Sequence, residues 1–372
     1  MRLRTARLDE VSLELVEPFE TSFGVQRDRR FFLLRLETRE GLVGYGECVT
    51  TDDPLYSSES NASVRDMLVR HFLPMILRAP AVAPETFRAG VAHFRGNEMA
   101  KSAVETALVD LAARDRRVSV ARYLGSSRDR IEVGVSVGIQ PTVPALVARV
   151  GRYLADGYRR VKLKVRPGWD AAPVRAVRRR FPELELWVDA NQAYPPTAVE
   201  KIRAWAEAYR VAQVEQPFPE RAIWAHALLA RGASFRVCLD ESITDETSLE
   251  DALATRALSS LNVKTGRVGG LLTGRDLARR AARARIPAWV GGMLESGIGR
   301  AHNVALAARE EMTLPADLSA SDRYYREDIV EPPFVLGPGS TLEVPRGPGI
   351  GVEVLEKTIR RHRLSSKTFR PG

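Results

Sequence analysis

Short runs of β-branched and aromatic residues recur about every 25 residues beyond position 130, and segments with helical spacing lie between them. The runs cover residues 133–138, 160–165, 184–189, 212–216, 235–240, 258–264 and 286–292. Ala198, Ile202, Trp205 and Tyr209 form one apolar stripe, which predicts a helix over 197–210. Alternating strands and helices predict a parallel sheet, and seven or eight such units favour a closed barrel of the TIM type.

An open, doubly wound sheet is the alternative arrangement of the same units. Such sheets bind dinucleotides through a GxGxxG turn after the first strand. The two candidate stretches, GYGECV and GIGRAH, each lack the third glycine of that pattern. The sequence therefore favours the barrel over the open sheet.

The first 125 residues follow a different pattern. Residues 30–49 predict two antiparallel strands around a turn at 39–41, and residues 99–114 predict a helix. These elements indicate an α+β domain before the barrel. The end of the chain is rich in turns and short strands, and we expect it to return to the first domain.

Lysine is rare in this chain and is concentrated in the predicted barrel. Only seven of the 56 basic residues are lysines, and three of them are Lys162, Lys164 and Lys264, in the second and sixth predicted strands. Arginine stays charged, whereas a lysine ammonium can release and recover a proton when its surroundings shift its pKa. The pattern therefore indicates acid–base chemistry.

Three acidic residues end consecutive strands between those lysines. Asp189, Glu215 and Asp240 are separated by 26 and 25 residues. Active sites of such barrels lie at the carboxyl ends of the strands, so the three carboxylates and three lysines should meet at one mouth. A strand-end salt bridge would explain any one of them alone, but not all six in this register. An all-oxygen site suits Mg²⁺, with Mn²⁺ or another divalent cation as a substitute.

Composition narrows the class of protein. The first 16 residues interrupt their apolar positions with charges, and no apolar run is long enough to span a membrane, so we expect a cytoplasmic protein without a membrane partner. The cysteines, Cys48 and Cys238, are too few for a disulfide framework and are expected to be buried thiols.

The net charge of +9 leaves nucleic-acid binding as an alternative, but the arginines alternate with acids and no nucleic-acid module accompanies them. We therefore expect no nucleic-acid partner.

Several motifs resemble a known superfamily. KLK at 162–164, DAN at 189–191, EQP at 215–217, DES at 240–242 and NVK at 262–264 resemble the muconate-lactonising subgroup of the enolase superfamily. GVSVGI at 134–139, VKLKVRPGWD at 161–170 and GGMLESGIGRAHNVALA at 291–307 are similar to its o-succinylbenzoate synthase / N-succinylamino acid racemase family. The likeness covers nearly the whole chain. It implies a modified (β/α)7β barrel at 126–325, an α+β capping domain at 1–125, and a segment at 326–372 that returns to the cap.

The resemblance also implies two reactions of a small carboxylate substrate. One is the syn dehydration that forms o-succinylbenzoate in menaquinone biosynthesis, and the other is the racemisation of N-succinylamino or other N-acylamino acids. Both begin with loss of a proton beside a carboxylate, and Mg²⁺ on Asp189, Glu215 and Asp240, with Lys162 beside it, would neutralise the resulting enediolate charge. Lys164 and Lys264 would flank the reacting carbon from opposite sides of the barrel.

Seven other positions are candidates for substrate contact: Phe23, Tyr56, Ser136, Asn191, Gly292, Met293 and Glu295. The alternative for these residues is a structural role in packing, capping or a tight turn. The resemblance places Arg267 close behind Lys264, where a like charge would lower the pKa of that lysine. A surface arginine at a strand exit is the alternative. We also expect a homo-oligomer.

Two other enzyme functions keep the same fold: dipeptide epimerase and muconate-type cycloisomerase. In dipeptide epimerases, an Asp-x-Asp motif near the eighth strand holds the ammonium group of the substrate. Here the corresponding stretch is Asp317, Leu318 and Ser319, which disfavours an amino-terminal substrate. A basic nucleic-acid-binding or scaffold protein would leave the register of lysines and acids unexplained.

Overall fold

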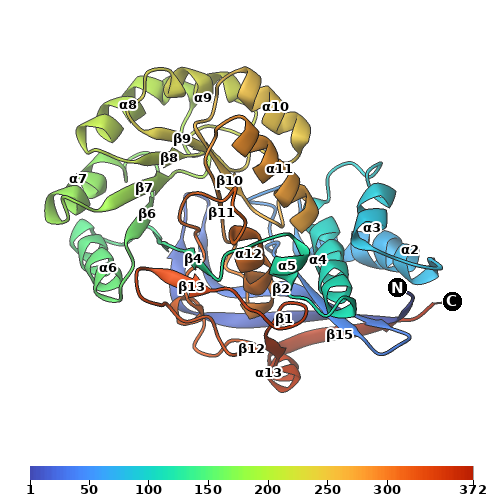
Figure 1. Cartoon of the computed structure of the whole chain (residues 1–372). Coiled ribbons are helices and arrows are strands. Elements are labelled where there is room, and N and C mark those ends of the chain that lie inside the picture. The colour runs from blue at the N-terminus through green and yellow to red at the C-terminus, as the bar shows by residue number, and fades with distance from the viewer. Residues whose placement is uncertain (372) are drawn as a thin grey trace.

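The computed structural model describes residues 1–371, which form a capping domain and a barrel (Figure 1). An antiparallel sheet in the order β15-β1-β2-β3 underlies the cap. Its strands are β1 Leu3–Glu20, β2 Val25–Thr38, β3 Val43–Cys48 and β15 Arg363–Phe369. The pairing of β2 with β3 is the hairpin predicted over 30–49, and β15 brings the end of the chain back beside β1.

Helices cover one face of the capping sheet. They are α1 Asn61–Met67, the π-helix η1 Leu68–Phe72, α2 Leu73–Arg78, α3 Pro84–Gly90, α4 Glu98–Asp115 and α5 Val120–Tyr123. Helix α4 lies so close to β3 that a Cβ atom at Gly46 would overlap the Ala103 carbonyl oxygen. The glycine at this position therefore allows the helix to pack against the strand.

The barrel consists of seven parallel strands in sequence order, with helices outside them. The strands are β5 Val135–Val137, β6 Arg160–Lys164, β7 Glu185–Asp189, β8 Gln213–Glu215, β9 Arg236–Leu239, β10 Ser260–Val263 and β11 Ala288–Val290. The helices are α6 Val143–Ala155, α7 Ala171–Arg180, η2 Pro196–Ala198, α8 Val199–Ala208, α9 Ile223–Ala230, α10 Glu246–Ala254, α11 Leu271–Arg283 and α12 Gly297–Ala307.

An irregular segment closes the barrel in place of an eighth regular strand. Asp317 bridges Gly291 after β11, and Ala316 bridges Val133 before β5, both in parallel. The segment therefore joins the two edges of the seven-stranded sheet. This arrangement confirms the predicted fold class, a modified TIM-type barrel with an α+β capping domain.

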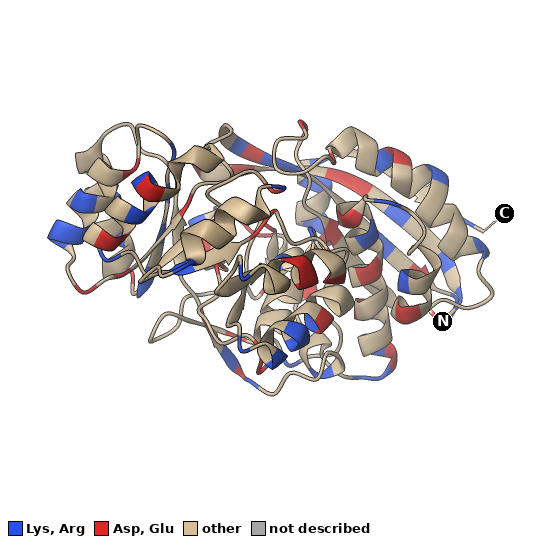
Figure 2. Ribbon diagram, turned by 90° about the horizontal axis from the view of Figure 1, so that it is seen from above, with Lys and Arg blue, Asp and Glu red and all other residues tan. Residues whose placement is uncertain are grey.

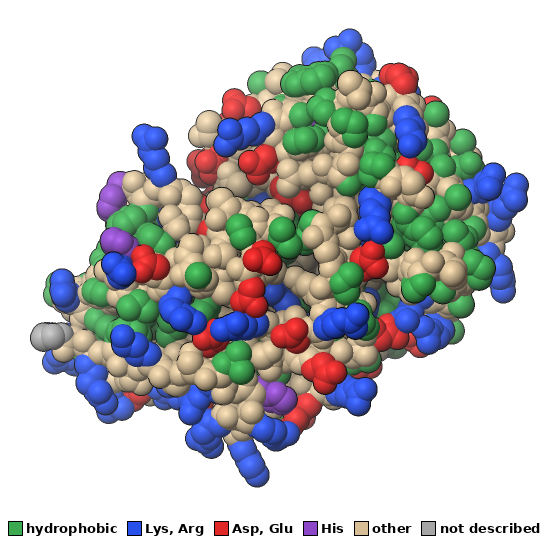
Figure 3. Space-filling model, turned by 180° about the vertical axis from the view of Figure 1, so that it is seen from behind, with side chains coloured by type: hydrophobic (Ala, Val, Ile, Leu, Met, Phe, Trp, Pro, Cys, Tyr) green, Lys and Arg blue, Asp and Glu red, His purple; other side chains and the backbone are tan. Residues whose placement is uncertain are grey.

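The remaining elements are one short strand before β5 and the elements that follow α12 along the chain. They are β4 Arg130–Glu132, η3 Ser321–Arg323, β12 Val330–Glu331, β13 Thr341–Glu343, β14 Glu353–Val354 and α13 Glu356–His362. Strand β13 pairs with β4, and β12 pairs with β14. Across residues 1–371, none of the helices combines the length and the apolar character needed to cross a bilayer. Lys and Arg are interspersed with Asp and Glu over the molecule (Figures 2 and 3).

Candidate active site

Three neighbouring strands bring the predicted carboxylates together at their carboxyl ends. Asp189 of β7 lies opposite Lys164 of β6 on one side and opposite Glu215 of β8 on the other. Asp240 directly follows β9. All three acids are buried, because the capping domain covers this end of the barrel. The structure thus places the three predicted carboxylates at one mouth.

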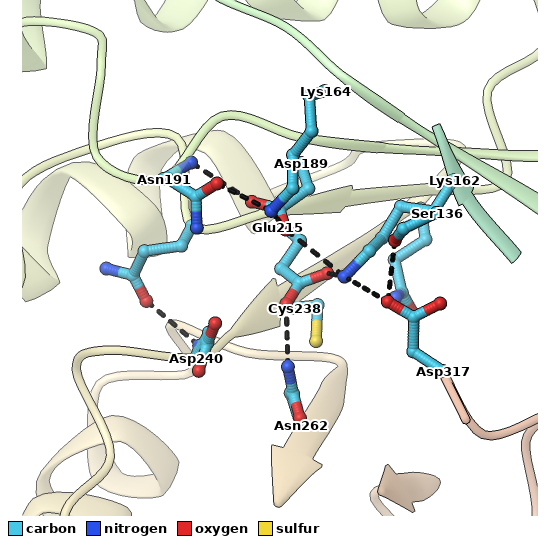
Figure 4. Close-up of polar contacts among 12 residues, drawn as sticks. Ser136, Lys162, Lys164, Asp189, Asn191, Glu215, Cys238, Asp240, Asn262 and Asp317 are labelled. Atoms are coloured by element: carbon cyan, nitrogen blue, oxygen red, sulfur yellow. Dashed lines mark hydrogen bonds and ion pairs between the residues drawn. The ribbon is translucent and has the colours of Figure 1, made fainter. Parts of the chain in front are cut away.

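The three predicted lysines contact these carboxylates directly. Lys162 Nζ lies 2.8 Å from Glu215 Oε2 and 3.1 Å from Asp189 Oδ2, as Figure 4 shows. Lys164 Nζ lies 2.7 Å from Asp189 Oδ2, and it also donates to Asn191 Oδ1 at 2.6 Å.

Lys264 approaches the carboxylates from β10, on the far side of the barrel from β6. Its Nζ lies 2.7 Å from Asp240 Oδ2. The two lysines that sequence reasoning assigns as bases therefore face one mouth from opposite sides.

Burial and neighbouring charge act against each other in this cluster. Burial raises the pKa of Glu215 to about 7, and the charge of Asp189 adds to that rise. Burial alone would also raise the pKa of Asp189 and Asp240. Lys164 and Lys162 beside Asp189, and Lys264 and Arg267 beside Asp240, outweigh burial and hold both pKa values below their usual range. Burial would lower the pKa of Lys264, yet Asp240 outweighs it and raises that pKa. A Lys264 that accepts a proton must therefore first be released from Asp240.

The residues present fit a divalent cation. In residues 1–371 no three His, Cys, Asp or Glu side chains are already arranged as metal ligands, since lysine ammonium groups contact the carboxylate oxygens. The donor set is nevertheless all oxygen, which suits Mg²⁺. Beside it, Glu241 Oε2 is buried without a hydrogen-bond partner, and burial together with Asp240 raises the pKa of Glu241 to about 8. This unpartnered oxygen belongs to a buried carboxyl group that a cation at this site could pair with.

A cavity at the barrel mouth brings most of the predicted substrate contacts together. It is lined by Phe19, Thr21, Phe23, Gln26, Arg29, Thr51, Tyr56, Ser136, Lys162, Lys164, Asn191, Lys264, Gly292, Met293, Leu294, Asp317 and Tyr324. Six of the seven predicted contacts are in this set. Tyr56 reaches into the cavity from the cap, where its hydroxyl donates to Asp240 Oδ1 at 2.7 Å and its ring centre lies 4.4 Å from Lys264 Nζ.

Comparison with known proteins agrees with this geometry. Residues 4–125 match the mandelate racemase / muconate lactonizing enzyme N-terminal domain, and residues 145–358 match the enolase C-terminal domain-like family. The chain is 46% identical to an N-succinylamino acid racemase of Amycolatopsis sp, over 96% of this chain and 97% of that protein. It is 38% identical to an o-succinylbenzoate synthase of Listeria innocua, over 99% of this chain and 98% of that protein. The chain belongs to the o-succinylbenzoate synthase / N-succinylamino acid racemase family.

Two solved structures resemble the protein along its whole length. An enolase superfamily member from Listeria innocua, 38% identical, superposes with a TM-score of 0.94 over 100% of this chain and 99% of that one. An N-succinyl Arg/Lys racemase from Bacillus cereus, 22% identical, shares the fold with a TM-score of 0.91 over the full length of both chains. As a member of the o-succinylbenzoate synthase / N-succinylamino acid racemase family within the enolase superfamily, the protein is an enzyme.

Glu295, a predicted substrate contact, does not line the cavity of this family member. Its Oε2 accepts a hydrogen bond from the Met293 backbone N–H at 2.8 Å, and its Oε1 accepts one from Asn303 Nδ2 at 2.9 Å. Both bonds tie the carboxylate to the segment that follows β11 and to α12. Glu295 therefore lies outside the residues that line the cavity, and its role as a substrate contact stays a prediction.

Arg267 is buried and not a surface residue. Its guanidinium pairs with Asp240, and its Nε donates to the Ile243 carbonyl oxygen at 2.7 Å. Arg267 and Lys264 thus share one carboxylate. Asp240 lies against both cations and raises the pKa of Lys264. The lowering of that pKa expected from the like charge of Arg267 stays a prediction.

Asp317 is a cavity residue that the sequence argument treated only as part of an incomplete epimerase motif. Its Oδ2 accepts from Ser136 Oγ at 2.6 Å and lies 3.1 Å from Lys162 Nζ (Figure 4). Its Oδ1 lies 3.0 Å from Arg160 Nη1. Arg160 precedes Lys162 by two positions on β6. Period-two spacing could therefore have placed Arg160 on the same strand face as Lys162, although it could not have shown their contact with Asp317. Ser136 therefore contacts Asp317, and three acids, Asp189, Glu215 and Asp317, hold the Lys162 ammonium.

Proposed function

We propose that this enzyme is an o-succinylbenzoate synthase, an N-succinylamino acid racemase, or both, and that it depends on Mg²⁺ or a substitute such as Mn²⁺. The observation that carries the proposal is the pair of lysines, Lys164 and Lys264, facing one carboxylate-lined mouth from β6 and β10. The names of the most similar relatives supply the two candidate reactions. Both reactions need a base placed at a carbon next to a carboxylate.

In the proposed site, Asp189, Glu215 and Asp240 hold the cation. When bound, the cation neutralises negative charge that develops on the substrate carboxylate during proton removal. Lys162 remains protonated because burial, which would lower its pKa, is outweighed by Asp317, Glu215 and Asp189. Its fixed ammonium adds to the same electrostatic stabilisation.

Racemisation requires the two remaining lysines to be in opposite protonation states. One takes the proton from the carbon next to the carboxylate, and the other donates a proton to the opposite face. The roles reverse for the other enantiomer. Each lysine must leave its carboxylate, Asp189 for Lys164 and Asp240 for Lys264, before its amine can act as a base.

Dehydration uses the lysines unequally. For syn elimination, Lys164 takes the proton and returns it to the hydroxyl that leaves from the same face. Lys264 then stays a cation throughout. The same arrangement of side chains therefore supports both reactions, with a stricter demand on Lys264 in racemisation.

The direct test is to assay the purified protein for both activities. Racemisation of N-succinylamino acid enantiomers is followed by polarimetry, and formation of o-succinylbenzoate from its dehydration precursor is followed by absorbance. We expect at least one activity, with a requirement for a divalent cation. A protein that catalyses neither reaction with Mg²⁺ or Mn²⁺ present would overturn the proposal.

The contacts of Asp317 disfavour the dipeptide epimerase alternative. An epimerase acid must be free to bind the substrate ammonium, but Asp317 is already paired with Arg160 and Lys162. The second position of that motif is Ser319, which carries no charge. A cytoplasmic location, homo-oligomeric assembly and the lack of a nucleic-acid partner stay predictions.

A further inference from the structure

The capping domain places one cation in the wall of the active-site cavity. Strand β2 directs Arg29 to the same face as Phe31 and Leu33, because side chains two apart in a strand share a face. Phe31 and Leu33 belong to the core cluster that includes the barrel strands, whereas Phe32 and Leu34 belong to the core cluster of the cap. Arg29 therefore points toward the barrel and reaches the cavity at its mouth.

Arg29 is buried without a carboxylate partner. Only 3% of its surface is exposed, and no carboxylate of residues 1–371 forms an ion pair with it. Its Nη1 donates to the Thr50 carbonyl oxygen at 2.9 Å, and its Nη2 donates to the Val49 carbonyl oxygen. A guanidinium has five N–H donors, so these two bonds leave others for a ligand. A buried charge without a counter-ion is costly, and an anionic ligand group would relieve that cost.

The rest of the cap side of the cavity is uncharged. Among the described residues, those that line it from the cap besides Arg29 are Phe19, Thr21, Phe23, Gln26, Thr51 and Tyr56. The three lysines lie on the barrel side, where they contact the carboxylate cluster. The cavity therefore has cations on two walls, one at the reacting end and one in the cap.

We propose that Arg29 binds the second carboxylate of the substrate, at the far end of the acyl chain, and so selects N-acyl groups that end in a carboxylate. The inference rests on the proposed function. Both candidate substrates carry a succinyl group and therefore a second carboxylate besides the one at the reacting end. The planar fork of arginine suits a carboxylate better than the point charge of lysine.

The test compares two substrates that differ only in the distal carboxylate: an N-succinylamino acid and the corresponding N-butanoylamino acid. Racemisation kcat/KM is measured for the parent, Arg29→Gln, Arg29→Lys and Arg27→Gln, the last an exposed arginine on the same strand. We expect Arg29→Gln to lose on the order of 10- to 100-fold with the N-succinyl substrate, mainly through KM, and less than about 3-fold with the N-butanoyl substrate. Arg29→Lys should fall between, and Arg27→Gln should match the parent.

Equal losses of Arg29→Gln on both substrates would overturn the inference, because they would show that Arg29 only ties the Val49–Thr50 backbone in place. The parent alone gives an independent result if that variant does not fold. A parent that turns over both substrates with equal kcat/KM does not recognise the distal carboxylate, which also overturns the inference while leaving the proposed function intact. A parent inactive on both substrates and in dehydration overturns the proposed function, and the inference with it.

Discussion

Buried carboxylates at the cap–barrel interface and at the barrel mouth differ in the groups that contact them. At the cap–barrel interface, Glu105 accepts from the Leu271 and Leu272 backbone N–H groups at 2.9 and 2.8 Å, at the start of α11. Glu47 accepts from the Ser296 and Gly299 backbone N–H groups at 3.0 and 2.9 Å, at the start of α12. Burial raises the pKa of both glutamates to about 7.

Glu215 at the barrel mouth is equally buried, and its pKa is also raised to about 7. Its partners, however, are side chains, Lys162 Nζ at 2.8 Å and Asn262 Nδ2 at 2.7 Å. The neighbouring acids Asp189 and Asp240 contact the proposed bases Lys164 and Lys264, whereas helical backbone N–H groups donate to Glu47 and Glu105. Free N–H groups at a helix start need an acceptor in any state of the protein. Burial and a shifted pKa therefore do not identify a chemical site by themselves, whereas contact with titratable side chains does.

The largest expected loss of activity comes from Glu215→Gln at the barrel mouth. The amide keeps the size of the side chain but removes the charge that Lys162 and the proposed cation require. We expect kcat/KM to fall by about 10³-fold or more, about 4 kcal/mol, in both reactions, with an unchanged circular dichroism spectrum and melting temperature within a few degrees. Exposed Glu207→Gln is the matched control.

Metal removal tests the same point without a mutation. Activity of the parent should disappear after exhaustive EDTA treatment and dialysis, and return with added Mg²⁺ or Mn²⁺. Full activity in the stripped protein would overturn the proposed dependence on a divalent cation.

The next effect separates the two lysines. Lys164→Ala and Lys264→Ala should each remove α-proton exchange in D₂O from only one enantiomer of an N-succinylamino acid, because each lysine faces one side of the reacting carbon. Proton NMR of each enantiomer measures the exchange, with exposed Lys201→Ala as a control. If either variant exchanged both enantiomers at the parent rate, the two-base assignment would be wrong.

A substitution at the cap–barrel interface should lower the stability of the protein and leave its catalytic rate unchanged. Glu105→Ala leaves two N–H groups of α11 without their acceptor, and we expect the free energy of unfolding to fall by about 2 to 3 kcal/mol. Urea unfolding measures that loss. The kcat of the folded variant should stay within about twofold of the parent, and a loss as large as that of Glu215→Gln would place Glu105 in the catalytic group after all.

Sequence reasoning could find the mouth because its residues follow simple periods. Asp189, Glu215 and Asp240 end successive strands, so their meeting follows from the parallel sheet. The pairing of Lys162 with Asp317 could not be found in that way, since Asp317 lies on the irregular segment that closes the barrel. The same holds for Arg29, which comes from the capping domain and reaches the cavity only through the packing of the two domains. Contacts across that packing depend on tertiary structure, and no local pattern in the sequence encodes them.

The smallest expected effect comes from a substitution at Arg267. This residue has features of both a fixed structural donor and a partner of the titratable cluster. Its guanidinium is fixed by the Ile243 and Asn262 carbonyl oxygens, like a structural donor, yet it shares Asp240 with the titratable Lys264. In Arg267→Gln, Asp240 would lose one of its two cations, and its charge would act more strongly on Lys264. The pKa of Lys264 should then rise further, which makes this lysine a poorer base. Racemisation needs Lys264 as a base in one direction, whereas dehydration needs it only as a cation.

We therefore expect kcat/KM for racemisation to fall by about tenfold or more in Arg267→Gln, about 1.4 kcal/mol, and kcat/KM for dehydration to fall less, with exposed Arg283→Gln as control. The pH profile adds a second measurement, since the alkaline optimum for racemisation should move upward in the variant. Equal losses in both reactions with an unmoved profile would mean that Arg267 only holds Asp240 in place.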